Sequence, residues 1–160
     1  MGSDHMSEGG IMISKILVPT DGSKTAQKAA RYGVDLAKQL HASVIVLSVI
    51  DQRTLISQTV PASQTVLHVI EPIEDYLRGA AEQYVGEIKK LCDKNGVPSK
   101  TVSTKGHPVE AIVKEATKSK VDLIVMGSHG RSALAAAVLG SVAYGVIHKD
   151  TKIPVLVVKK

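Results

Sequence analysis

The sequence predicts an α/β protein built on a parallel sheet with helices on both faces. Short apolar runs alternate with segments of helical periodicity, from the first strand to the last, in a β-α-β-α-β-α-β-α-β order. The runs are rich in Val, Ile and Leu, as is typical of strands buried on both faces. Phe and Trp are absent, so aliphatic side chains must fill the core.

The 160 residues suit one domain, and no repeat or low-complexity linker divides them. Apolar residues make up 44% of the chain and charged residues 22%, which indicates a globular protein. The first six residues resemble a remnant left by a cloning vector. We therefore expect residues 1–14 to be this remnant and a disordered terminus, and residues 15–160 to be the single domain.

The first half of the chain predicts two strands and one helix. The first strand is expected over residues 15–19, before a turn at residues 20–23 that offers helix-capping groups. The helix that follows carries apolar or small residues on one face: Ala26, Ala29, Ala30, Gly33, Val34, Ala37 and Leu40. The second strand is expected over residues 43–50. Residues 52–68 lack a clear period and contain Pro61, which indicates an irregular excursion.

A second helix is expected to begin near Glu71 and Pro72, with the proline in its first turn, and to be capped by Gly96. Residues at helical spacing form its apolar face: Ile73, Leu77, Ala80, Ala81, Tyr84, Ile88 and Leu91.

The remaining elements continue the alternation. A weaker third strand is expected over residues 99–103, and a third helix begins at Pro108. A fourth strand is expected over residues 121–126, a fourth helix over residues 135–148 and a last strand over residues 154–158.

Two loops after predicted strands carry unusual chemistry. One is Pro19-Thr20-Asp21-Gly22-Ser23, and the other is Gly127-Ser128-His129-Gly130, followed by Gly140-Ser141. Ligands of parallel α/β sheets bind at the carboxyl ends of the strands, where the strand order reverses. Glycines let backbone N–H groups approach a phosphate, and a helix N-terminus favours an anion. The spacing fits neither the Walker loop nor the dinucleotide fingerprint, so phosphate binding and tight packing are equally supported.

Several single residues have both a structural and a functional interpretation. Asp21 can cap the helix that follows it, or hydrogen-bond to a ribose hydroxyl or an adenine edge. Val49 can be a core residue or an apolar wall for a base. His129 and Arg131 can add donors or positive charge beside a phosphate. Cys92 is expected to be an inert core thiol.

Composition argues against several classes of function. One cysteine permits no disulfide within the chain and no cysteine-based metal site, and the histidines lack ligand spacing. The net charge of +5 is scattered and aromatic residues are few, so we expect no nucleic-acid binding. With no signal peptide and no apolar run long enough to span a bilayer, we expect a cytoplasmic protein without membrane contact. No nucleophile, base and orienting group stand together, so nothing indicates an enzyme.

The spacing Gly127-x2-Gly130-x9-Gly140-Ser141 resembles the ATP-binding signature of the universal stress protein family. Residues 16–23 resemble the first strand and loop of that family, and residues 153–158 resemble its last strand. The resemblance implies a Rossmann-like, five-stranded parallel sheet of order 3-2-1-4-5, as in adenine nucleotide alpha hydrolase-like folds. In that order the first and fourth strands are neighbours, and the two unusual loops face one cleft.

The resemblance also implies which residues contact ATP. The ribose and adenine positions are Pro19, Thr20, Asp21 and Val49. The phosphate and ribose positions are Met126, Gly127, His129, Gly130, Gly140, Ser141 and Val142. Ala143 stands where some ATP-binding relatives carry a hydroxyl residue, which removes one phosphate donor. A Mg²⁺ or Mn²⁺ ion bridging the phosphates is expected, although no dedicated carboxylate cage is visible.

The family resemblance further implies a homodimer through the edge strand Val155–Val158, since an apolar edge is unsafe if left bare. Three functions stay open. The first is an ATP-binding sensor or switch with little turnover that acts on a protein partner. The second is a slow ATPase or a phosphoryl or nucleotidyl transferase. The third is a dimeric interaction module with an empty nucleotide site. The intact glycine motif favours the first function, and the missing Walker lysine argues against efficient chemistry.

Overall fold

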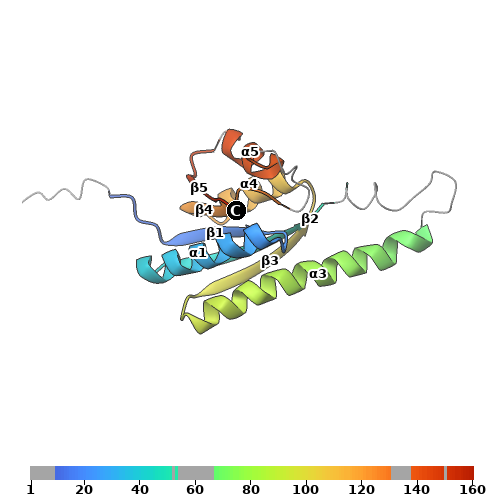
Figure 1. The fold of residues 1–160 in the computed structure, drawn as a ribbon, viewed down its shortest axis with the longest axis horizontal. Helices are drawn as coiled ribbons and strands as arrows, with labels where there is room; N and C mark the ends of the chain where they lie inside the picture. The colour runs from blue at the N-terminus through green and yellow to red at the C-terminus, as the bar shows by residue number, and fades with distance from the viewer. Residues whose placement is uncertain (1–9, 52, 54–66, 131–137, 150) are drawn as a thin grey trace, which may run out of the picture.

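The computed structural model describes residues 10–51, 53, 67–130, 138–149 and 151–160. Strands and helices alternate along this part of the chain, as the sequence predicts (Figure 1). The elements are β1 (Lys15–Thr20), α1 (Lys24–Leu40), β2 (Ser43–Ile50), α3 (Leu67–Lys94), β3 (Ser99–Lys105), α4 (Pro108–Lys118), β4 (Leu123–Gly127), α5 (Ser141–His148) and β5 (Val155–Val158).

The strands form one parallel sheet in the order β3-β2-β1-β4-β5, which confirms the predicted fold class and strand order. β1 lies between β2 and β4, with Ile16 opposite Val44 on one side and Leu123 on the other. The chain leaves β1 toward β2 and later returns to the other side of β1 as β4. The carboxyl ends of these three strands therefore meet at the point where the strand order reverses.

Helices α1 and α3 cover one face of the sheet, and α4 and α5 cover the other (Figure 1). Successive residues of a strand point to opposite faces, so Ile16 joins the core under α1 and Leu17 joins the core under α4 and α5. Both side chains are fully buried. The all-aliphatic strands are thus explained by helices on both faces. In the described residues no helix is long and apolar enough to cross a membrane.

The start of α1 corrects the capping interpretation of Asp21. Ser23 is the N-cap, and its Oγ accepts a hydrogen bond from the Ala26 N–H at 3.1 Å. Asp21 instead accepts a hydrogen bond from the Ser23 N–H at 2.9 Å, which folds the turn before the helix. The predicted apolar face of α1 is buried except for Leu40, which is 42% exposed near the end of the helix.

Helix α3 begins earlier than predicted. Its first residue is Leu67, so Pro72 lies inside the helix and not in its first turn. Pro72 is exposed and has no N–H, so α3 lacks one backbone hydrogen bond at this position. Cys92 is fully buried on this helix, as predicted, and burial raises the pKa of its thiol. Of the predicted excursion, residues 52 and 54–66 lie outside the described residues.

The predicted fourth helix is too long at its start. Residues 138–140 are not helical, and α5 begins at Ser141 after the N-cap Gly140. The Gly140 N–H donates to the Ser128 carbonyl at 2.7 Å, which holds Gly140 in an extended conformation. Residues 135–137 of the predicted helix lie outside the described part of the chain.

Strand limits also shift by one or two residues. β3 continues to Lys105, beyond its predicted end. β4 runs over Leu123–Gly127 because the Val121 N–H donates to the Ala116 carbonyl and so closes the end of α4. β5 begins at Val155, one residue after its predicted start.

Candidate functional site

A cleft of about 670 Å³ opens at the carboxyl ends of β1, β2 and β4. Its walls come from the loops after β1 and β4, the end of β2, one side of α3 and the starts of α4 and α5. The cleft is lined by the predicted site residues that the structure describes: Pro19, Thr20, Asp21, Val49, Met126, Gly127, His129, Gly130, Gly140, Ser141 and Val142. Arg131, the remaining predicted site residue, lies outside the described residues.

The loop after β1 (residues 19–23, the Asp21 loop) is a tight turn. The Oγ1 atom of buried Thr20 accepts a hydrogen bond from the Gly22 N–H at 3.2 Å. Gly22 has a φ of +76°, and a Cβ at this position would collide with the ring of Tyr84 on α3. Only glycine satisfies both the backbone conformation and the contact. The turn therefore holds Asp21 at the cleft while α3 packs against it.

The Asp21 loop touches the loop after β4 (residues 127–130, the glycine loop). A Cβ added to Gly130 would lie 2.6 Å from the Asp21 Oδ2 atom. At Gly127 an added Cβ would lie 2.9 Å from the Thr25 methyl group, and at Gly140 it would lie 2.9 Å from the Ser128 carbonyl oxygen. Close packing therefore requires glycine at 127 and 140, where the added atom would meet backbone atoms, whereas at 130 the end of the Asp21 side chain would have to move. The same glycines line the cleft, so close packing and anion binding are compatible here.

Backbone hydrogen bonds connect the glycine loop to its neighbours. The Ser128 N–H donates to the Val158 carbonyl at 2.9 Å, which ties the loop to β5. The Ser128 Oγ lies 2.8 Å from the His129 Nδ1 atom, and these two residues are only 2% and 8% exposed. His129 is therefore a buried ring held beside a hydroxyl. The adjacency of Ser and His in the sequence was the available signal for this pair.

The start of α5 brings a helix N-terminus to the cleft. Gly140 has no side chain to cap the first turn, and Ser141, Val142 and Ala143 line the cleft. The N-terminal end of a helix carries partial positive charge and N–H groups without helical partners. This end of the cleft is therefore suited to an anion, with the Ser141 hydroxyl as an additional hydrogen-bonding group.

Helix α3 forms a wall that the sequence did not predict. Tyr76, Leu77, Ala80, Ala81 and Tyr84 line the cleft along one side of the helix. Leu77 and Ala81 pack with Ile50 at the end of β2. The helical period correctly identified an apolar face of α3. It carried no information on which loop that face meets, because this depends on the path of the helix across β2.

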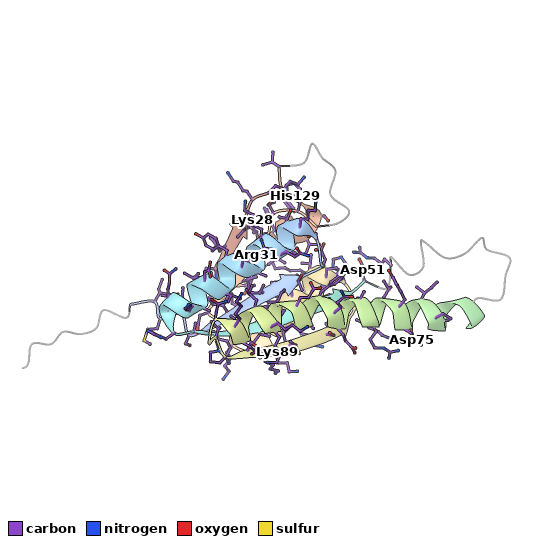
Figure 2. The ribbon with its side chains drawn as sticks, turned by 60° about the horizontal axis from the view of Figure 1, so that its bottom comes forward. Lys28, Arg31, Asp51, Asp75, Lys89 and His129 are labelled. Atoms are coloured by element: carbon purple, nitrogen blue, oxygen red, sulfur yellow. The ribbon has the colours of Figure 1, made fainter. Side chains whose placement is uncertain are left out.

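Asp51 stands at the end of β2 and also lines the cleft, and it was not among the predicted site residues (Figure 2). The Arg53 backbone N–H and Nε–H donate to Asp51 Oδ1 at 2.9 and 3.1 Å, and Arg53 Nη2 donates to Oδ2 at 2.9 Å. The hydrogen bonds from the Arg53 side chain lower the pKa of the Asp51 carboxyl. Asp51 is therefore a carboxylate at neutral pH.

The fold and the cleft define an α/β protein with a glycine-walled ligand cleft at the switch point of a parallel sheet. The model of the universal stress protein family matches residues 12–159, and the chain belongs to this family. The chain is similar to two universal stress proteins of Methanocaldococcus jannaschii. It is 36% identical to MJ0531, over 93% of this chain and 84% of that protein, and 38% identical to MJ0577, over 94% and 97%.

Solved structures show the same fold. The structure of MJ0577 matches with a TM-score of 0.77 and 37% identity, covering 94% of this chain and 98% of that one. A universal stress protein in complex with cAMP matches with a TM-score of 0.62 and 26% identity, covering 92% of this chain and 98% of that one. The family predicted from the glycine spacing is thus confirmed.

Proposed function

We propose that this chain binds ATP in the cleft and acts as a nucleotide-dependent sensor or switch with little or no turnover. The observation that carries the proposal is the convergence of Asp21, the glycine loop and the N-terminus of α5 on one cleft. An adenine nucleotide, cAMP, is bound by a relative with the same fold. The triphosphate end of the ligand goes to the glycine loop and α5, because both offer backbone N–H groups to an anion.

The order of the strands gives the ligand its direction. β1 lies between β4 and β2, so a nucleotide with its phosphates at the glycine loop passes Asp21 before it reaches the end of β2. Asp21 and Thr20 then lie at the ribose, where a carboxylate accepts hydrogen bonds from hydroxyls. Val49, at the end of β2, provides apolar surface for the base, and Met126 lies at the phosphate and ribose end beside the glycine loop.

We propose that Mg²⁺ or Mn²⁺ enters with the nucleotide. Among the described residues no group of three His, Cys, Asp or Glu side chains is placed to hold a metal ion. The phosphates and water would therefore supply most ligands, as is usual for Mg²⁺ bound with a nucleotide.

The site is better suited to holding ATP than to cleaving it. The glycine loop carries no Walker lysine to stabilise charge on a transferred phosphoryl group. Nucleotide contacts reach α5, whose outer side exposes Tyr144 and Ile147. Binding of a nucleotide in the cleft would thus alter the exposed surface of α5, to which a protein partner can bind. We further propose that two copies pair through β5, which is an edge of the sheet.

Isothermal titration calorimetry with Mg-ATP tests the proposal, together with mass spectrometry of the nucleotide that co-purifies. We expect one ATP bound per chain and recovered intact after incubation. Steady release of ADP or AMP would instead support the slow enzyme. An absence of both heat and thermal stabilisation at millimolar Mg-ATP would overturn the proposal in favour of an interaction module with an empty site.

A further inference from the structure

Tyr76 lines the cleft at the β2 end, although the residue is 75% exposed. The chain has four tyrosines and no Phe or Trp, and two of the four, Tyr76 and Tyr84, line this one cleft. Tyr84 is packed on Gly22 of the Asp21 loop, whereas the Tyr76 ring is open to solvent. An exposed aromatic ring on a cleft wall offers a flat apolar face on which a base can stack.

The position of Tyr76 is set by the anchoring of α3. Leu77, the next residue, packs with Ile50, Ile73 and Ala81 in a small apolar cluster at the end of β2. Figure 2 shows the helix continuing past Asp51 to the labelled Asp75, so this part of α3 overhangs the carboxyl end of the sheet. Tyr76 is therefore held at the cleft by a packed helix and not by a loop.

Asp51 places a hydrogen-bond acceptor at the β2 end of the cleft, where Tyr76 also lies. Its two oxygens accept hydrogen bonds from Arg53, and a carboxylate oxygen has capacity for a further donor. An ionised carboxylate only accepts hydrogen bonds. It therefore favours a base whose edge carries an amino group and disfavours one that carries a carbonyl oxygen at that position.

We propose that Tyr76 stacks on the base of the bound nucleotide and that Asp51 accepts a hydrogen bond from its 6-amino group. This chain then selects adenine nucleotides over those with a 6-oxo purine. The inference rests on the proposed function, because the base reaches Asp51 and Tyr76 only when the phosphates lie at the glycine loop. The ends of β2 and β4 are two strand spacings apart, about 10 Å, which a nucleotide can span.

The stacking role is tested by calorimetry of the full chain with Mg-ATP. Tyr76→Ala should raise the Kd about tenfold or more, because stacking of one base contributes about 1–3 kcal/mol. Tyr76→Phe should bind as the wild type does, since the ring is kept. Tyr32→Ala is the matched control, because Tyr32 is an exposed tyrosine on α1 that does not line the cleft. Tripolyphosphate, which lacks a base, should bind Tyr76→Ala and the wild type equally.

The base preference is tested with ATP and inosine triphosphate, which differ at the 6-position and in the proton on the neighbouring ring nitrogen. The wild type should prefer ATP. Asp51→Asn should narrow or reverse that preference, because the amide can donate to a 6-oxo group. Asp75→Asn is the control, since Asp75 is an exposed acid on α3 that pairs with Arg78 and does not line the cleft.

The outcomes separate the two proposals. If the wild type binds none of ATP, inosine triphosphate and tripolyphosphate, the proposed function fails and the base site fails with it. If the wild type binds ATP, two outcomes would overturn the inference alone. One is that Tyr76→Ala binds ATP as tightly as the wild type does. The other is that Asp51→Asn keeps the wild-type ratio of the Kd for inosine triphosphate to the Kd for ATP. Thermal unfolding of each variant shows whether it is folded, so a lost affinity is assigned to the site only for folded variants.

Discussion

At the scale of single residues, the glycines of the motif have a structural role that does not depend on a ligand. Gly127, Gly130 and Gly140 each lie where a Cβ would meet neighbouring atoms at 2.6–2.9 Å. By contrast, a Cβ at Gly86 on α3 would meet no atom within 4 Å. Gly127 is therefore fixed by close packing on Thr25 of α1 and Gly140 by close packing on the glycine loop, whereas Gly130 leaves room for the Asp21 side chain.

Gly130→Ala should weaken ATP binding about tenfold, because the added methyl group displaces the end of the Asp21 side chain from the ribose, and a hydrogen bond to a charged group contributes about 1.5–3 kcal/mol. Calorimetry with Mg-ATP measures the change. Gly86→Ala is the matched control, and we expect unchanged affinity with a gain of about 0.5–1 kcal/mol in the free energy of unfolding in urea. Wild-type affinity in Gly130→Ala would show that Asp21 can move without consequence for the ligand.

At the scale of elements, Asp122 joins the start of β1 to the start of β4. Its Oδ2 atom accepts hydrogen bonds from the Ser14 N–H at 2.9 Å, the Ser14 hydroxyl at 3.0 Å and the Lys15 N–H at 3.0 Å. The hydrogen bond from the Ser14 N–H is the main cause of the lowered pKa of the Asp122 carboxyl. The contact fixes where the two central strands begin to pair.

Asp122→Asn should therefore lower the free energy of unfolding at pH 7 by about 1 kcal/mol, a value reduced for solvent exposure. The folded-state pKa lies below the ordinary 3.8, so the carboxylate stabilises the fold above about pH 4. That contribution is lost as the pH falls through the folded-state pKa. Urea unfolding at a series of pH values should show the two proteins converging in acid.

Asp35→Asn is the control for this experiment, because Asp35 is an exposed acid on α1. We expect that variant to unfold as the wild type does across the same pH series. A constant difference between wild type and Asp122→Asn down to the lowest pH would contradict a charge-dependent contribution.

At the scale of the whole molecule, the two edge strands of the sheet, β5 and β3, differ in polarity. The carbonyls of Pro154 and Val158 accept hydrogen bonds from β4 and the residue after it. Residues alternate along a parallel strand, so Val155 and Val157 direct their N–H and C=O groups to the open edge. The exposed edge of β5 is short and apolar, whereas β3 at the other edge has the polar sequence KTVSTK after its first residue. β5 is therefore the edge that favours pairing with a second copy.

Val157→Pro should convert the proposed homodimer to a monomer, because it removes an N–H donor from the open edge and keeps the hydrogen bonds to β4. Size-exclusion chromatography with light scattering gives the mass in solution. Ser103→Pro is the control on the outer edge of β3 and should leave the dimer intact. A monomeric wild type would contradict the proposed assembly without bearing on ATP binding.

Local patterns were enough to predict the fold class and to single out two unusual loops, and the family resemblance added the strand order that brings these loops to one cleft. Apolar runs and helical spacing report which residues are buried, and alternation of the two dictates a parallel sheet. The Asp21 loop and the glycine loop were recognisable because their residues are contiguous and their chemistry is local. The predicted element boundaries were wrong where a contact between residues far apart in the chain sets the boundary. Gly140 begins α5 because it bonds to Ser128, and no periodicity within residues 135–148 contains that bond.

The tertiary structure alone decided the rest of the cleft. Tyr76 on α3 and Asp51 after β2 are 25 positions apart in the chain, and neither belongs to a motif. They share a wall because Leu77 packs on Ile50 and carries the helix over the end of the sheet. Such packing depends on shape and volume between elements, and sequence spacing reports only the period within one element.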